Sequence, residues 1–317
     1  MIVAAVDCGT NSIRLLVADA HDGRLETLRR ELRIVRLGAG VGATGEFTAA
    51  ALDRTFAACA EYARIIADCG AERVRFVATS AARDAGNRVA FARGVAERMG
   101  VEPDVISGDE EARLSFRGAT TGLSELAAAR PPYLVVDIGG GSTEFVLGGD
   151  GTADRVDAVV AARSVDVGCV RLTERHLCTD PPSPHEVAAA VLDVDAGLEQ
   201  ARATVPLAKA MSVVGVAGTV TTVAAAALDL DRYDRSRLHH SVLSSARIHG
   251  AAGMLLALPR AGLAALPYMH PGRVDVIGAG ALILDRVLAA VPGVEELVVS
   301  ETDILDAIAA RLADPDA

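Results

Sequence analysis

The chain has 317 residues, of which 51% are hydrophobic and 23% charged, and this length and composition favour a globular protein of two domains. The formal net charge of −11 argues against broad nucleic-acid binding, because a polyanion would have to be met by local arginines. The five cysteines include no C-x-x-C pair, which argues against a disulfide framework or zinc site and favours reduced thiols in the cytoplasm.

The first half of the chain begins on a strand. Residues 2–38 predict a strand, an Asp-x-Gly-Thr turn, a second strand, a hairpin and a third strand. Because a strand pattern starts at once, no secretory signal is expected. A helix is predicted over 48–70, a strand over 74–80, a helix over 87–99, and a strand over 103–107 that leads into DEEARLSFRGAT.

The same order returns in the second half of the chain. Residues 133–174 again predict strand, small-residue turn, strand, hairpin and strand. Further along, a strand and its helix are expected from MSVVGVAG, and other helices over 184–203, 242–258, 273–290 and from Glu301 onward.

One uncharged run, residues 210–228, is just long enough to be considered as a membrane span. Its β-branched part, its glycine-threonine turn and its alanine-rich part are better explained as buried strand, loop and helix. No membrane segment is therefore expected.

The repeated order predicts an α/β protein with two similar domains. We place the first domain at residues 1–124 and the second at 125–300, with the segment GLSELAAARPP as the crossing between them. The C-terminal helix 301–317 is expected to pack back on the first domain.

Each half of the chain places an acid at a strand end before a small-residue turn. Glycines 139–141 would let a phosphate chain approach the main chain, and Ser142 and Thr143 would add hydroxyl donors. Asp137 and Glu144 supply hard oxygen ligands that suit Mg²⁺ shared with substrate phosphates. A glycine-rich hairpin without a ligand is the alternative, because glycine turns are common.

Two other nucleotide-binding patterns are disfavoured. GAGVGATG, residues 38–45, contains the G-x-G-x-x-G spacing but follows a third strand and does not open a first βαβ unit. Lys209 is the only lysine, so the G-K-[ST] of a P-loop is absent.

Several motifs together resemble one known family, that of exopolyphosphatase and guanosine pentaphosphate phosphohydrolase. They are VDCGTNSIRLLVAD (6–19), FVATSAARDAGN (76–87), VISGDEEARLSF (105–116) and VVDIGGGSTEFV (135–146). The resemblance continues in order through 168–177, 213–222, 273–284 and 299–305.

The resemblance implies a fold. The family belongs to the actin-like, Hsp70-like and sugar-kinase superfamily, so two actin-like (ribonuclease H-like) domains are expected, each a mixed β-sheet flanked by helices, with an interdomain active-site cleft. Longer members carry additional C-terminal helical domains, whereas this chain resembles the short two-domain form. A preference for short polyphosphate chains is expected from that difference.

The resemblance also implies the catalytic residues. Glu111 corresponds to the family's general base, and a carboxylate there can orient and deprotonate a water molecule. The neighbouring Asp109 and Glu110 would tend to raise the pKa of Glu111. Arg83 resembles the arginine that binds phosphate near the base, with a planar two-point contact. Without the family match, Asp109, Glu110 and Glu111 would be explained by the start of a helix, where acidic side chains interact favourably with the helix dipole.

The remaining site residues come from three turns. Asp7 is expected to help hold the metal, directly or through water, and Arg14 to face either substrate or solvent. Gly215, Gly218 and Thr219 mark a strand-loop-helix junction, at which related folds bind phosphate or nucleotide at a helix N-terminus. The predicted substrate-binding residues are Gly9, Thr10, Asn11, Ser12, Arg14, Gly139, Gly140, Gly141, Ser142, Thr143, Gly218 and Thr219.

The expected function is hydrolysis of the terminal phosphate of inorganic polyphosphate, with Mg²⁺ as cofactor, Mn²⁺ as its substitute and a monovalent cation as a further ion. Positioning and charge neutralisation dominate such a transfer. Guanosine pentaphosphate 5′-phosphohydrolase, a non-catalytic polyphosphate or nucleotide sensor, and a sugar-kinase-like transferase are the alternatives. Polyphosphate, guanosine or adenine nucleotides, and a second copy of the chain in a homodimer are the expected partners.

Overall fold

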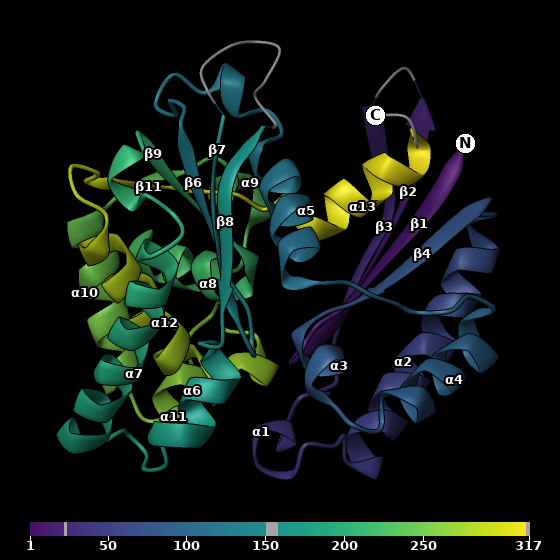
Figure 1. Ribbon diagram of the computed structural model, residues 1–317, viewed down its shortest axis with the longest axis horizontal. Helices are drawn as coiled ribbons and strands as arrows, with labels where there is room; N and C mark the ends of the chain where they lie inside the picture. The colour runs from purple at the N-terminus through teal and green to yellow at the C-terminus, as the bar shows by residue number, and fades with distance from the viewer. Residues whose placement is uncertain (22–23, 150–157, 315–317) are drawn as a thin grey trace. The chain divides into compact units, whose positions relative to one another are not determined.

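The computed structural model describes residues 1–21, 24–149 and 158–314 (Figure 1). The chain divides into two compact units, the first made of residues 1–114 and 304–317 and the second of residues 115–303. The domain boundary expected after residue 124 stays a prediction. The tip of the second predicted hairpin, at 150–157, and the last three residues of the predicted C-terminal helix lie outside the described residues.

The first unit contains one five-stranded sheet in the order β3-β2-β1-β4-β5. Strands β1, β2 and β3 pair antiparallel, whereas β4 and β5 run parallel to β1. The elements in chain order are β1 (Ile2–Cys8), β2 (Ser12–His21), β3 (Arg24–Ile34), α1 (Val41–Thr44), α2 (Ala49–Asp68), β4 (Arg73–Ala78), α3 (Ser80–Asp84), α4 (Arg88–Met99), β5 (Asp104–Val105), the first half of α5 (Gly108–Thr120), and α13 (Ile304–Ala313).

The apolar sequence of β1 explains why helices cover both faces of this sheet. Successive side chains of a strand point to opposite faces. Ala4 and Val6 join the core beneath α2 and α4, whereas Val3 and Ala5 join a second core with α13. Figure 1 shows α2 and α4 on one face of the sheet and α13 on the other. A strand buried on both faces therefore carries no polar alternation.

The second unit contains a six-stranded sheet in the order β10-β11-β9-β6-β7-β8. Its elements are the second half of α5, η1 (Leu123–Glu125), β6 (Tyr133–Ile138), β7 (Thr143–Gly148), β8 (Val159–Val165), α6 (Cys169–His176), α7 (Pro184–Arg202), η3 (Leu207–Lys209), β9 (Ser212–Val216), α8 (Ala217–Ala227), α9 (Arg235–Leu238), β10 (Val242–Ser244), α10 (Ser245–Ala257), α11 (Arg260–Ala264), η4 (Pro271–Arg273), α12 (Ile277–Ala290) and β11 (Glu296–Val299).

The two sheets share one topology, which confirms the repeat predicted from the sequence. Strands β6, β7 and β8 pair antiparallel, and β9 and β11 continue the sheet in parallel. Listed from its opposite edge, the second sheet has the order β8-β7-β6-β9-β11-β10. Its first five strands correspond in order to β3-β2-β1-β4-β5, and β10 is an additional edge strand. Each unit therefore ends its first strand at an equivalent turn.

Three predicted boundaries are wrong. Residues 242–244 form the edge strand β10, and helix α10 begins only after Ser244, whose side chain accepts a hydrogen bond from Arg247 N. Helix α12 begins at Ile277 because the short helix η4 precedes it. Helix α13 begins at Ile304, after a turn in which the Ser300 hydroxyl bonds the Thr302 carbonyl oxygen at 2.8 Å.

The uncharged run 210–228 is a strand followed by a helix, as predicted, although α8 begins directly after β9 and no loop separates them. Among the described helices, none combines the length and apolar character that crossing a membrane requires.

We predict opposite effects of alanine at two helical glycines. A Cβ at Gly118, in α5, would lie 1.8 Å from the carbonyl oxygen of Asp303, whereas a Cβ at the exposed Gly250, in α10, would meet nothing within 4 Å. Gly118→Ala should lower the free energy of unfolding by about 1–3 kcal/mol through overpacking. Gly250→Ala should raise it by about 0.4–1 kcal/mol. Urea denaturation measures both, and equal effects would contradict the prediction.

Candidate active site

The predicted phosphate turns of the two units have the same backbone geometry. Gly9 N donates to Ser12 O at 2.9 Å, and Gly139 N donates to Ser142 O at 3.0 Å. In each unit this hydrogen bond closes the turn between the first two strands. The sequence echo therefore corresponds to a structural one.

The second turn rests on the N-terminus of α6. The hydrogen bonds run from Cys169 N to Gly139 O (3.0 Å), from Val170 N to Gly140 O (2.9 Å), and from Arg171 Nε to Gly141 O (2.8 Å). In a trans peptide the carbonyl and the following N–H point in opposite directions. The N–H groups of Gly140, Gly141 and Ser142 therefore point away from α6.

The first turn is held in the same way by the segment after β3. Thr10 O accepts from Gly38 N at 2.9 Å, and Asn11 O accepts from Val35 N at 3.0 Å and from Arg36 N at 2.8 Å. By the same peptide geometry, the N–H groups of Asn11 and Ser12 point away from this segment.

A glycine makes each contact possible. A Cβ at Gly168 would lie 2.5 Å from the carbonyl carbon of Gly140, and a Cβ at Gly38 would lie 2.3 Å from Thr10 Cγ2. Both distances are shorter than real Cβ contacts, so the supporting segment can approach the turn only without a side chain.

The acids before the two turns have opposite partners. In the first unit, Asp7 pairs across the strands with Arg14, whose Nη2 lies 2.6 Å and Nε 3.0 Å from Asp7 Oδ2. In the second unit, the equivalent partner of Asp137 is Glu144. The guanidinium of Arg14 thus binds Asp7, and the role of Arg14 toward substrate stays a prediction.

The acidic pair of the second unit is almost excluded from water. Asp137 is 8% exposed and Glu144 is 1% exposed. Like charges placed directly opposite on neighbouring strands are destabilising. Hard carboxylate oxygens in this arrangement are a suitable donor set for a divalent cation.

Two serine hydroxyls bind this acidic pair. Ser115 Oγ, on α5, donates to Asp137 Oδ2 at 2.5 Å. Ser164 Oγ, on β8, donates to Glu144 Oε1 at 2.7 Å. Sequence reasoning missed both serines. The signal for Ser164 was the strand register, which places it opposite Glu144.

The predicted base and the predicted phosphate-binding arginine lie together in the first unit. Arg83 Nη1 donates to Glu111 Oε2 at 2.6 Å and to the carbonyl oxygen of Ile106 at 3.1 Å. Arg83 lies in the last turn of the short helix α3, and Glu111 lies in the first turn of α5. Glu111 is buried. The rise in the pKa of Glu111 that we expected from Asp109 and Glu110 stays a prediction. Arg75 Nη2 binds Glu110 Oε1 at 2.9 Å and so balances the charge of Glu110.

Two predicted hydroxyl donors bond within their own unit. Thr143 Oγ1 donates to the carbonyl oxygen of Val167 at 2.6 Å. The Thr10 and Ser80 hydroxyls lie 2.9 Å apart in a buried position. The substrate-binding roles of these threonines stay predictions. Ser80, from the same motif as Arg83, was not predicted.

The third predicted turn is covered by an arginine. A Cβ at Gly218 would lie 2.2 Å from Arg273 Nη2, and Arg273 Nη1 donates to Thr222 Oγ1 at 3.1 Å. Thr219 is buried beside Cys169, and burial raises the pKa of the Cys169 thiol to about 11. That thiol is therefore neutral near pH 7 and is not an activated nucleophile.

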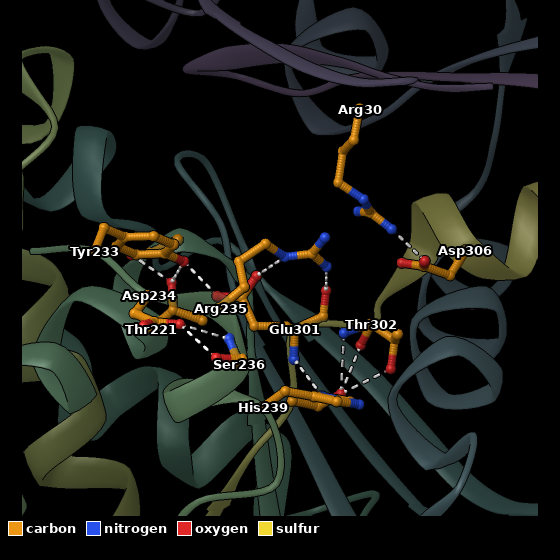
Figure 2. A network of polar contacts seen from close by, with 12 residues as sticks. Arg30, Thr221, Tyr233, Asp234, Arg235, Ser236, His239, Glu301, Thr302 and Asp306 are labelled. Atoms are coloured by element: carbon orange, nitrogen blue, oxygen red, sulfur yellow. Dashed lines mark hydrogen bonds and ion pairs between the residues drawn. The ribbon is translucent and has the colours of Figure 1, made fainter. Parts of the chain in front are cut away.

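A polar network fixes the helix that follows this turn. Figure 2 shows Glu301 between Tyr233, Arg235 and His239. Arg235 Nε donates to Glu301 Oε2 at 2.7 Å, and the Tyr233 hydroxyl contacts both the Glu301 carboxylate and Thr221 Oγ1 of α8. Burial, and secondarily the charge of Glu301, raises the pKa of Tyr233. The network thus ties α8 to the segment after β11.

A scan of protein families matches residues 16–303 to the Ppx/GppA phosphatase family. The chain belongs to this family. It is 49% identical, over 98% of both chains, to "Exopolyphosphatase 2" of Mycobacterium tuberculosis. A crystal structure of an exopolyphosphatase-like protein matches with a TM-score of 0.93 and 42% identity, covering 98% of this chain and 96% of the other. The Aquifex aeolicus PPX-GPPA enzyme matches with a TM-score of 0.79 and 29% identity, covering 98% of this chain and 99% of the other.

These comparisons confirm the family predicted from the motifs, and the two mixed sheets flanked by helices confirm the predicted α/β fold class. The roles of individual site residues stay predictions.

The structure predicts that His239 lowers stability in acid. Burial, and then the nearby charges of His240 and Arg235, lowers the pKa of His239 from 6.5 to about 4. Its Nδ1 also accepts a hydrogen bond from Glu301 N at 3.2 Å, which a protonated ring could not do. Between these two pH values the unfolded chain binds the proton and the folded chain does not, so stability falls as pH falls.

His239→Gln should make this dependence shallower. The free energy of unfolding, measured by urea denaturation at several pH values from 8 to 4, should lose part of its slope in the variant between pH 6.5 and 4. At pH 8 the His239 ring is neutral in both the folded and the unfolded chain. The free energy of unfolding at pH 8 therefore gives the effect of the substitution without any effect of protonation. An unchanged slope would show that His239 does not contribute.

Proposed function

We propose that this chain is an exopolyphosphatase that removes the terminal phosphate of inorganic polyphosphate and releases orthophosphate. The observation on which this rests is the buried pair of facing carboxylates, Asp137 and Glu144, at the two sides of a turn whose N–H groups point away from α6. A pair of buried acids beside a main-chain anion site suits a metal-bound phosphate substrate.

In the first unit, we assign Glu111 as the general base. Its carboxylate takes a proton from water as the water oxygen attacks the terminal phosphorus, and the bond from phosphorus to the bridging oxygen breaks. The leaving group is a chain one phosphate shorter. Arg83 Nη1 donates to Glu111 Oε2 at 2.6 Å, and the guanidinium has further N–H groups that can donate to a phosphate oxygen. It therefore orients the base and balances charge on the substrate.

In the second unit, we assign Asp137 and Glu144 to a divalent cation, with Mg²⁺ as the expected ion and Mn²⁺ as its substitute. Carboxylate oxygens fit either ion, and water and substrate phosphates complete the coordination of Mg²⁺. A bound cation neutralises charge on the phosphate oxygens. Asp7, whose Oδ2 binds Arg14, would join it directly or through water. A monovalent cation is retained as a further proposed ion.

The turns supply the substrate contacts in this proposal. Main-chain N–H groups of Asn11, Ser12, Gly140, Gly141 and Ser142 would bind the phosphate oxygens, because these fixed donors point away from the segments that hold the two turns. Gly218 and Thr219 keep their proposed role at a third contact, with Arg273 as an additional cation beside them. No guanosine pocket is needed for this recognition.

Polyphosphate is preferred here to guanosine pentaphosphate as substrate. The relative named exopolyphosphatase is 49% identical over 98% of this chain. The "Guanosine-5'-triphosphate,3'-diphosphate pyrophosphatase" of Photobacterium profundum is 35% identical over 55% of this chain and 33% of its own length. Short chains, a cytoplasmic location and a homodimer complete the proposal. A sensor role would require binding without turnover.

Substitution of two neighbouring glutamates, Glu111 and Glu110, should distinguish loss of the general base from loss of a nearby charge. Glu111→Gln should lower kcat for polyphosphate by about 10²–10⁴-fold, because an amide cannot accept the proton of the attacking water. Glu110→Gln, on the same helical turn, should retain most activity, since Glu110 instead binds Arg75. Orthophosphate release from short polyphosphate, long polyphosphate, guanosine pentaphosphate and ATP measures both variants. Full activity in Glu111→Gln would refute the assignment.

Removal of the metal carboxylates should give a different result. Glu144→Gln should raise the Mg²⁺ concentration for half-maximal activity by at least about tenfold, because the amide loses the charge that attracts the cation. Chelation of divalent ions should abolish turnover, and added Mg²⁺ should restore it. Activity that persists in a chelator would contradict the metal assignment while leaving Glu111 as base.

A further inference from the structure

Ser115 has an unusual hydrogen bond for a serine inside a helix. Serine and threonine hydroxyls in a helix commonly bond the carbonyl four residues earlier. Thr120, on the same helix, does so, with Oγ1 at 2.9 Å from the carbonyl oxygen of Phe116. Ser115 is 0% exposed and instead donates its proton to Asp137 Oδ2 at 2.5 Å. Its hydroxyl is directed at the acid and not at its own helix.

Ser164 acts on the other acid of the pair. It lies opposite Glu144 in the pairing of β7 with β8, and its hydroxyl donates to Glu144 Oε1 at 2.7 Å. The two serines come from different elements, a helix and an edge strand. Ser115 and Ser164 thus each donate a hydroxyl hydrogen bond, which adds no charge, to one acid of the pair.

We propose that Ser115 and Ser164 are positioning residues that hold Asp137 and Glu144 in the geometry that binds the divalent cation. This inference rests on the proposed metal site. A hydroxyl takes only one acceptor position of a carboxylate, which has about four, and it leaves the negative charge that attracts a cation unchanged. A lysine or arginine in the same place would neutralise the acid, as Arg14 does for Asp7 in the first unit.

The hydroxyls also keep two repelling groups in place. Without the serines, the carboxylates could rotate away from each other, since like charges directly opposite on neighbouring strands are unfavourable. A cation would then have to reorder both side chains on binding. Groups that hydrogen-bond to metal ligands typically contribute 10–100-fold to metal affinity. Glu111 lies one helical turn before Ser115 on α5, so the helix that carries the proposed base also positions a metal ligand.

The test measures binding of Mn²⁺ alone to the full chain by electron paramagnetic resonance, without substrate or turnover. Ser115→Ala and Ser164→Ala should each weaken Mn²⁺ binding by about tenfold or more. Thr120→Val removes a buried hydroxyl from the same helix, makes no change near the acids and should bind Mn²⁺ as the wild type does. Asp137→Asn provides the reference for loss of a ligand. Circular dichroism establishes that each variant is folded.

The outcomes separate this inference from the proposed function. Wild-type Mn²⁺ affinity in both serine variants, with binding lost in Asp137→Asn, would overturn the positioning role and leave the metal site intact. Unchanged binding in Asp137→Asn would overturn the metal site itself. A second readout is turnover at rising Mg²⁺, where the serine variants should recover most of the wild-type kcat. A variant with merely damaged packing would not recover. If Ser115→Ala does not fold, Ser164→Ala alone decides.

Discussion

Two buried acids that face each other across neighbouring strands are the constraint on which the chemistry of the second unit depends. The register of β6 and β7 places Asp137 and Glu144 directly opposite each other, so their main-chain positions are fixed by the sheet while their side chains can still rotate. Ser115 and Ser164 donate hydrogen bonds to this pair, and the metal that we propose for it would balance its negative charge.

The two units share the backbone geometry of one turn but place different side chains beside it. Both units place an acid one residue before the end of their first strand, close the same turn and hold it through a close-packed glycine. A single difference, Arg14 in place of Glu144, converts an acid pair into an ion pair. The acid of the first unit is thus bound by an arginine across the strands, whereas the acid of the second unit faces another acid, for which we propose a cation. Fold symmetry does not imply chemical symmetry.

The proposed base, Glu111, is held by an arginine and not by a serine hydroxyl. Arg83 contacts both Glu111 and the Ile106 carbonyl, so the arginine fixes the start of α5 relative to the loop before it. An arginine can make these contacts at once because its guanidinium presents several donors in one plane. Charge balance and orientation are therefore supplied by the same side chain.

The sequence by itself determined the repeated strand order, the family, and the two acidic strand ends, because strand periodicity and small-residue turns are local signals. It also indicated Glu111 and Arg83, through motifs that resemble the family. Only the tertiary structure decided that Arg14 binds Asp7 and that Ser115 and Ser164 bind the acidic pair. Those contacts depend on strand register and on a helix packing over a distant strand, neither of which a local pattern specifies.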